Sequence, residues 1–200
     1  IDSDQFIVTG FDNGDLAYGD TATTGDFARR ESEGGVFSGG VYAFDIDGSN
    51  DRILGVQPTG NDFTPGTIEM QVRNDTGSTV ESVNVVYDLA VLNDADRGNT
   101  FNLEYAVGTA GTPGSFSAVS GGTFTSPEVA DIPASWSSTN FDLDITGLTL
   151  AAGEYLFLRW SSDDSLGGGS RDEFGLNNLS LTPSAGTDTT APRVSTFSPA

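Results

Sequence analysis

The sequence predicts an all-β protein, an antiparallel two-sheet β-sandwich whose expected form is a jelly roll. Three observations lead to this fold class. Apolar and polar residues alternate with a period of two along many short runs, which is typical of half-buried strands. Helix signals are nearly absent, and 26 glycines stand with Ser, Thr, Asn and Asp between the runs. About ten strands at this spacing, in a chain of 200 residues, fit one large sandwich domain.

The first thirty-five residues have the weakest strand pattern. Residues 5–9 are predicted to form an edge strand. Residues 10–35 are polar and rich in glycine, and they are predicted to form a long surface excursion.

A β-hairpin is predicted for residues 67–89. Residues 67–73 and 82–89 both alternate cleanly, so each strand has one apolar face. The Asn-Asp-Thr-Gly sequence at residues 74–77 is a tight connection between them. The side chains expected to face inward are Ile68, Met70, Val72, Val83, Val85, Tyr87 and Leu89.

The C-terminal half supplies the remaining strands. Residues 103–107 and 141–145 alternate in the same way. Residues 155–160 are apolar on both faces, so they are predicted to form a central strand with Trp160 in the core. Leu176, Leu179 and Leu181 close the domain, which is expected to span residues 1–186.

The composition excludes several classes of function. The chain carries 29 acidic residues against 8 arginines and has a net charge of -21, which argues against nucleic acid or anionic lipid as a direct partner. It has no cysteine and no histidine, and therefore no disulfide, no thiolate nucleophile and no imidazole base. No stretch is long and apolar enough for membrane insertion. We therefore expect a non-enzymatic protein that is secreted or at the cell surface, and the start at Ile1 is typical of a mature N-terminus.

Four stretches, in order over residues 36–182, resemble a family of β-sandwich modules in secreted bacterial multidomain proteins. They are Gly40-Val-Tyr-Ala-Phe44, Asp51-Arg-Ile-Leu-Gly55, Val72-Arg-Asn-Asp-Thr-Gly77 with Val83-Asn-Val-Val-Tyr87, and Leu158-Arg-Trp160 with Leu176-Asn-Asn-Leu-Ser-Leu181. Such modules occur beside nuclease, lamin-tail and bacterial Ig-like domains, and the resemblance implies a jelly-roll-like accessory module without catalytic activity. The chain departs from the family at Asn177 and Asn178, where the family usually has paired aspartates.

Three oxygen-rich clusters are candidate Ca²⁺ ligands, because Ca²⁺ takes six to eight oxygens from carboxylates, amides and carbonyls on flexible loops. The first holds Asp45, Asp47, Asn50 and Asp51; the second Asn93, Asp94 and Asp96; the third Asp163, Asp164, Asp172 and Glu173. The first lacks the twelve-residue frame of an EF-hand. The alternative is that these residues are turn formers with solvated carboxylates.

Two features of the sequence bear on sugar binding and on sugar hydrolysis. Trp136 is the best candidate for stacking on a sugar ring, and the alternative is a loop aromatic folded onto the rim of the sandwich. Carboxylate pairs such as Asp142 and Asp144 match the requirement of glycoside hydrolysis, but such pairs arise by chance in a chain this acidic. Catalysis is therefore not expected.

Residues 187–200 are predicted to be a polar linker followed by a strand without a partner. Thr190-Ala-Pro192 and Ser198-Pro-Ala200 resemble the start of a bacterial Ig-like domain. The partner of this strand is either the next domain or another subunit, in which case Val194 and Phe197 would fill pockets by strand addition. Residues 5–9 are the alternative donor segment for such an assembly.

Two functions follow from these features. The first is a structural one: a subunit or repeat of a bacterial surface filament, sheath or adhesin, with identical subunits or neighbouring domains as partners. The alternative is a carbohydrate-binding or accessory module of a secreted hydrolase or nuclease, with polysaccharide as partner.

Overall fold

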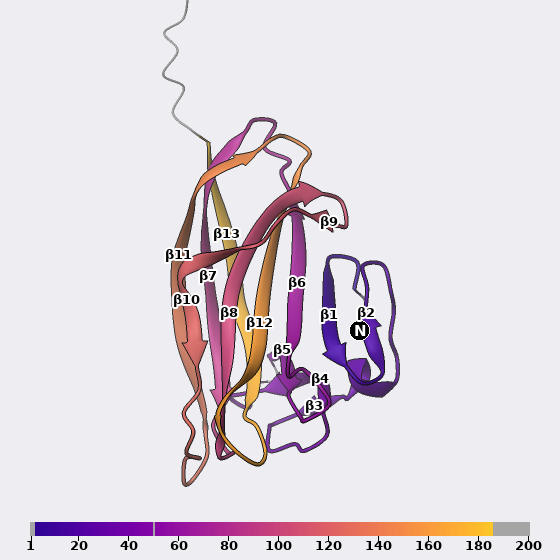
Figure 1. The fold of residues 1–200 in the computed structure, drawn as a ribbon, viewed down its shortest axis with the longest axis vertical. Helices are drawn as coiled ribbons and strands as arrows, with labels where there is room; N and C mark the ends of the chain where they lie inside the picture. The colour runs from indigo at the N-terminus through magenta and orange to yellow at the C-terminus, as the bar shows by residue number, and fades with distance from the viewer. Residues whose placement is uncertain (1–2, 50, 186–200) are drawn as a thin grey trace, which may run out of the picture.

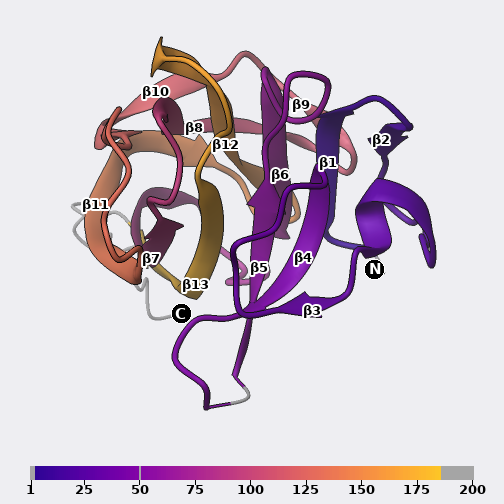
Figure 2. The same cartoon turned by 90° about the horizontal axis from the view of Figure 1, so that it is seen from below.

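Two β-sheets pack face to face in the structure, a computed structural model that describes residues 3–49 and 51–185 (Figures 1 and 2). The seven-stranded sheet contains β1 (Phe6–Phe11), β2 (Gly14–Leu16), β6 (Gly66–Arg73), β8 (Arg97–Thr109), β9 (Thr112–Pro113), β10 (Ser117–Thr125) and β12 (Tyr155–Gly167). The six-stranded sheet contains β3 (Glu31–Ser32), β4 (Gly40–Asp45), β5 (Arg52–Gln57), β7 (Val80–Leu92), β11 (Trp136–Leu150) and β13 (Glu173–Ala185). The predicted all-β sandwich is confirmed.

The strand order places β8 and β12 inside the first sheet and β7 and β13 inside the second. The first sheet runs β10-β8-β12-β6-β1-β2, with β9 beside β8, and the second runs β11-β7-β13-β5-β4-β3. Neighbours are antiparallel except β3 and β4, which are parallel. In the parts of the chain that the structure describes, the only helix is the 3-10 helix η1 (Gly25–Ala28), and none could cross a membrane.

The core lies between the sheets, where the period-two pattern predicts it. Val85, Tyr87 and Leu89 of β7 face Leu158 and Trp160 of β12, and all are at most 1% exposed. The central position predicted for residues 155–160 is confirmed, because β12 pairs with β8 on one side and with β6 on the other.

The predicted hairpin over residues 67–89 is wrong. β6 pairs with β1 and β12, whereas β7 pairs with β11 and β13 in the other sheet. The connection is an arch held by buried Asn74, whose Nδ2 donates to the carbonyl oxygens of Ser78 and Leu150, each at 2.8 Å. These bonds replace the hairpin ladder, so the chain crosses between the sheets at this point.

The N-terminal segment also differs from the prediction. β1 is not an edge strand, because β2 pairs with its free side. Residues 10–35 hold β2, η1 and β3, and Leu16 and Phe27 from this stretch are buried in the core. The pattern is too short in each piece to be read as structure from the sequence.

The six-stranded sheet is incomplete on one side. β5 pairs with β13 only over Phe174–Leu176, whereas β13 continues to Ala185 with β7 as its only strand partner among the described residues. In Figure 1, β3, β4 and β5 lie in the lower half of the view and β13 runs on to the top. We call the unoccupied position beside Ser180–Ala185 the open slot.

Candidate functional site: a polar and aromatic sheet face

Three charged side chains form a row across the outer face of the seven-stranded sheet. Arg159 of β12 is in register with Glu69 of β6 and with Glu104 of β8. Its neighbours in sequence, Leu158 and Trp160, point into the core, so Arg159 points outward. Its Nε and Nη2 donate to Glu104 Oε2 at 3.0 and 2.9 Å. We call Glu69, Arg159 and Glu104 the outer row.

Two aromatic rings flank the outer row. The Arg159 guanidinium lies over the ring of Phe116, with Cζ 3.6 Å from the ring centroid, which is a cation–π contact. On the other side, Tyr18 Oη donates to Glu69 Oε1 at 3.1 Å. Burial raises the pKa of Tyr18 well above its usual value, so the hydroxyl remains a hydrogen-bond donor. Burial also raises the pKa of Glu69, against the opposing effects of Tyr18 and Arg159.

The next register across the same face is polar throughout. Thr9 pairs with Thr67, Thr67 with Ser161, and Ser161 with Asn102. The Oγ1 atoms of Thr9 and Thr67 are 2.8 Å apart and share a hydrogen bond. This face therefore offers rings, charges, hydroxyls and an amide side by side, a combination that suits a polar ligand with apolar ring faces.

No pattern in the sequence predicts this face. Tyr18 lies in the stretch predicted to be a surface excursion, and Phe116 lies between β9 and β10. Only the register of β6, β12 and β8 brings Glu69, Arg159 and Glu104 into one row.

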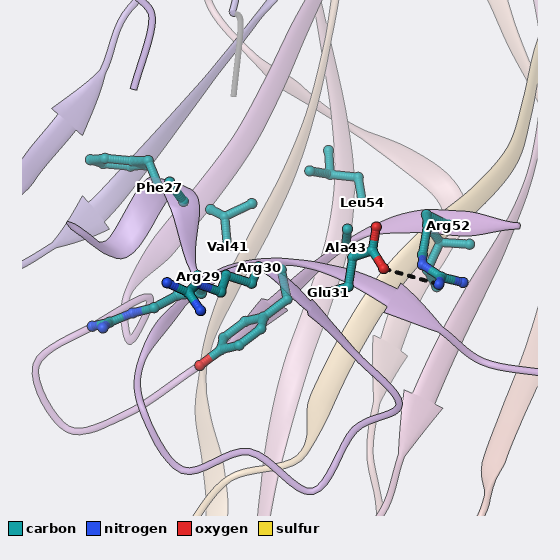
Figure 3. Close-up of a pocket in the computed structure, with 11 residues that line it drawn as sticks. Phe27, Arg29, Arg30, Glu31, Val41, Ala43, Arg52 and Leu54 are labelled. Carbon is teal, nitrogen blue, oxygen red and sulfur yellow. Dashed lines mark hydrogen bonds and ion pairs between the residues drawn. The ribbon is translucent and has the colours of Figure 1, made fainter. Parts of the chain in front are cut away.

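A pocket of about 380 Å³ opens at the edge of the six-stranded sheet (Figure 3). Its walls include Phe27, Val41, Ala43 and Leu54, and Arg29, Arg30 and Arg52 border it. Arg52 forms ion pairs with Glu31 at 3.1 Å and with Asp45 at 2.7 Å. Arg30 has a φ of 101°, a left-handed backbone conformation that is uncommon for residues other than glycine.

A group of three aspartates that the sequence analysis missed forms a candidate cation site. Asp12 lies on the β1–β2 turn, Asp26 in η1 and Asp62 between β5 and β6. Over the described residues it is the one group of three acidic side chains whose ligand atoms all lie within 4.8 Å. Contact with Asp26 raises the pKa of Asp12. These residues are too far apart in sequence for spacing to reveal the group.

Further contacts hold these aspartates in place. Arg29 forms an ion pair with Asp26, and Asn13 Nδ2 donates to it. The backbone N–H of Asp12 and the hydroxyl of Thr59 donate to the Asp62 carboxylate at 3.1 and 2.7 Å. Asp26 and Asp62 are buried, whereas Asp12 is exposed. The Asp12 carboxylate is thus open to solvent, whereas the contacts above hold the buried carboxylates of Asp26 and Asp62 in place.

The first cluster predicted from the sequence lies on and around the β4–β5 turn. Asp45 is paired with Arg52, and its Oδ1 accepts from the backbone N–H of Gly48 at 2.8 Å. Asp47 accepts from Ser49, which lowers the pKa of its carboxyl. Asp51 is exposed, and Asn50 lies outside the described residues. The proposed Ca²⁺ ligation by this cluster stays a prediction.

The third predicted cluster is split in the structure. Asp164 accepts from Arg97 and from both Nε and Nη2 of Arg171, the last two at 2.8 and 2.6 Å. These two arginines lower the pKa of Asp164 against the opposing effect of burial. Asp163 is exposed beside it, whereas Asp172 and Glu173 are fully buried.

Asp172 and Glu173 lie close to Asp94, which belongs to the second predicted cluster. Glu173 Oε1 accepts from the backbone N–H of Val36 at 2.7 Å, and Asp172 Oδ1 from that of Ala95 at 3.3 Å. Burial is the main cause that raises the pKa of Glu173 to about 8 and that of Asp172 to about 6, and the Asp94 charge adds to both. The remaining members are apart from them: Asp96 accepts from Ala130 N–H at 3.3 Å, and Asn93 Nδ2 donates to the Val129 carbonyl oxygen at 2.9 Å.

Trp136 begins β11 and packs on the outer face of the six-stranded sheet. Its ring lies 5.0 Å from that of Phe44, and its Nε1 donates to the Glu33 carbonyl oxygen at 2.7 Å. The side chain is half-buried against Gly34, and sugar stacking by Trp136 stays a prediction. Val194 and Phe197, proposed for assembly, lie outside the described residues.

No protein-family model and no curated protein matches the chain. Among solved structures it is similar to a Clostridium thermocellum endo-1,4-β-D-xylanase fragment with CBM22-1 and GH10 modules in complex with xylohexaose, at 12% identity over 78% of this chain and 26% of that one, TM-score 0.40. A CBM28 module specific for non-crystalline cellulose is 11% identical over 72% of this chain and 79% of that one, TM-score 0.39. A CBM4 structure is 16% identical over 74% and 91%, TM-score 0.32.

A bacteriophage CBA120 tailspike protein 4 enzymatically active domain is also similar, at 5% identity over 74% of this chain and 18% of that one, TM-score 0.39. The chain thus spans about a quarter of the xylanase fragment and less than a fifth of the tailspike domain. At these identities and TM-scores no family is assigned to the chain. What the solved structures offer is a distant likeness of fold.

Proposed function

We propose that the chain is a non-catalytic module that binds carbohydrate and serves as an accessory unit of a larger secreted protein. The observation that carries this proposal is the outer row, with Phe116 against Arg159 at its centre and Tyr18 against Glu69 at one end. Sugars present hydroxyl groups around a ring whose faces are apolar, so they need charged or amide hydrogen-bond partners next to aromatic surfaces.

The state of the two outer-row carboxylates fits binding better than catalysis. Glu104 is held by a two-donor ion pair with Arg159, and Glu69 accepts the Tyr18 hydroxyl. Both are therefore engaged as acceptors, and neither is poised as a free acid opposite a free base. Glu104, which is partly exposed, can still accept a sugar hydroxyl on its remaining lone pairs, whereas buried Glu69 holds Tyr18 in place.

The test is calorimetric titration of the chain with a panel of soluble neutral polysaccharides and oligosaccharides. Arg159→Ala and Phe116→Ala are each expected to weaken binding by about tenfold, which corresponds to roughly 1.4 kcal/mol for a lost polar or aromatic contact. Arg73→Ala is the matched control, because Arg73 pairs only with exposed Asp75 at 3.0 Å at the end of β6. No binding to any glycan, or binding that both variants leave unchanged, contradicts the proposal.

We also propose Ca²⁺ as the ion for Asp12, Asp26 and Asp62. All ligand atoms offered there are carboxylate oxygens, which hard cations prefer, and one exposed carboxylate leaves a path for entry. Added Ca²⁺ is expected to raise the melting temperature and EDTA to lower it, by mass action. Asp12→Asn should remove that response without unfolding the chain, because Asp12 is exposed. The same melting curve with Ca²⁺ and with EDTA would contradict this proposal.

A second candidate function is the structural one, a subunit or repeat of a surface filament, sheath or adhesin. The observation that favours it is the open slot beside β13, since an unpaired strand edge is a template for another strand. This candidate and the carbohydrate-binding one use different surfaces of the sandwich. The same chain could therefore have both functions, and both are compatible with a modular protein.

A further inference from the structure

The open slot has the dimensions of a missing strand. On its β7 side, β13 is paired in register from Ser180 with Val86 to Ala185 with Val80. On its other side the same residues have no strand partner in the part of the chain that the structure describes. Strand pairing on that side stops at Leu176, which is in register with Leu54 of β5.

The core under the open slot is not closed. Leu158, Leu89 and Val85, at the centre of the sandwich, are fully buried, but Met70 and Leu181 are only partly buried although they pack against the same core. Met70 lines one hollow beside β13 and Leu181 lines another. A strand in the open slot would therefore cover apolar surface as well as backbone groups.

Two hollows mark the same place. One, of about 240 Å³, reaches Met70 and Trp160 and is bordered by Phe6, Leu176 and Leu179. The other, of about 110 Å³, is lined mainly by side chains from β6, β7, β12 and β13; they include Val72, Val83, Leu156, Leu181 and Pro183. Both hollows are lined in part by residues of β13, and both are mainly apolar.

We propose that the open slot is an acceptor site for a β-strand from residues 187–200 of a second copy of this chain. This inference rests on the second candidate function and supplies the acceptor that it needs. The strand would pair its main chain with the free edge of Ser180–Ala185 and place apolar side chains, Val194 and Phe197 among them, against the hollows.

The charge of this segment suits the site. Of the 29 acidic residues only Asp188 lies in residues 187–200, and Arg193 balances it. The rest of the chain carries the whole net charge of -21, so an acidic segment would be repelled by the body of a second copy. A neutral segment with apolar side chains is not.

The spacing favours a second copy over the same copy. Residues 186–191 are a polar stretch of six residues between the end of β13 and Pro192. Hairpin loops usually have two to five residues, so a spacer of this length and composition fits a reach to a neighbour better than a tight return. Donor and acceptor are different surfaces, so the contact is head-to-tail and adds subunits in an open series.

The experiment is light scattering on the full chain over a series of concentrations, together with a chain that ends at Ala185. The full chain is expected to form concentration-dependent oligomers, and the shortened chain to remain a monomer. A synthetic peptide of residues 187–200 is expected to bind the shortened chain and raise its melting temperature, whereas a scrambled peptide of the same composition has no effect.

Two variants keep the test independent of folding. Val194→Asp and Phe197→Asp change only the proposed donor segment, and they should abolish oligomers while leaving the melting temperature of the monomer unchanged. Leu181→Asp should block the acceptor. Oligomers that persist in Val194→Asp and Phe197→Asp overturn the proposal.

Two other results also overturn it. One is a full chain that is monomeric at every concentration. The other is a monomer that loses stability when residues 187–200 are removed, because that would mean pairing within one copy. Glycan binding by Val194→Asp is measured in parallel, and its loss or survival reports on the carbohydrate-binding proposal alone.

Discussion

Glu173 is a carboxyl group held in a fully buried position, and its protonation links stability to pH. Its pKa is raised from 4.5 to about 8, first by burial, then by the charge of Asp94, against the Val36 N–H bond that lowers it. The pKa of Asp172 is raised as well, first by burial and then by the charges of Asp94 and Asp131. Between about pH 4.5 and 8 the folded protein therefore holds a proton that the unfolded chain releases.

The sign of the effect follows from this proton. In metal-free buffer the contribution of Glu173 to the free energy of unfolding is fully present below pH 4.5 and is lost as the pH rises towards 8. Glu173→Gln should flatten this dependence, because a neutral amide replaces the carboxyl. Urea unfolding from pH 5 to pH 8 measures it, and a variant with the same slope as the parent contradicts the assignment.

Gly39 is the residue that lets Asp62 lie where it does. A Cβ at this position would be 2.0 Å from Asp62 Oδ2 and 2.7 Å from its Cβ, so Gly39→Ala should displace the aspartate at a cost of about 1–3 kcal/mol. Gly60→Ala is the control in the loop that carries Asp62, since the nearest contact of a Cβ at Gly60 is 3.8 Å away. Thermal unfolding of both variants checks the difference, and equal melting temperatures contradict it.

At the scale of the strand connections, the arch at Asn74 shows what alternation predicts and what it leaves open. The period-two pattern correctly gave β6 and β7 and their buried faces, because burial of one face depends on local sequence. It could not tell a hairpin from a crossing between sheets, because the choice is made by the bonds of Asn74 to residues as distant as Leu150.

Asn74→Ala tests the strength of this arch. It would leave the buried carbonyl oxygen of Leu150 without its side-chain donor, so we expect a loss of about 1–3 kcal/mol in the free energy of unfolding. Asp75→Ala, which removes only an exposed ion pair with Arg73, should cost less than about 1 kcal/mol. Denaturant titration of both variants decides the point, and equal losses would show that the arch is not held by Asn74.

At the scale of the whole molecule, the net charge of -21 should govern stability in solution. Mutual repulsion of the surface carboxylates opposes the compact state, and salt screens it within a Debye length of about 10 Å at 0.1 M. The melting temperature is therefore expected to rise with sodium chloride concentration in the presence of EDTA. A melting temperature that falls as salt is added would show that the ion pairs dominate.

The candidate sites could be predicted from the sequence only in part, because each one depends on contacts between residues that are distant in sequence. The sequence placed Asp172 and Glu173 in one acidic cluster with Asp164. In the structure Arg97 and Arg171 bind Asp164 instead, and the sequence does not show which carboxylate these arginines contact. The outer row and the Asp12 group combine segments distant in sequence; the sheet register brings the first together, and the packing of a turn, η1 and a loop brings the second together. A single sequence holds the residue types but not these distances.

The pairing of β13 with β7 also decides how the sandwich responds to tension. β13 is hydrogen-bonded along β7 over nearly its whole length, from Glu173 to Ala185, and ladder bonds lie perpendicular to the strands. A pull on Ala185 along the strand axis loads these bonds in shear, so they must break together and not one after another. Anything attached beyond Ala185 is therefore anchored to the sandwich through a strand that resists the pull in shear.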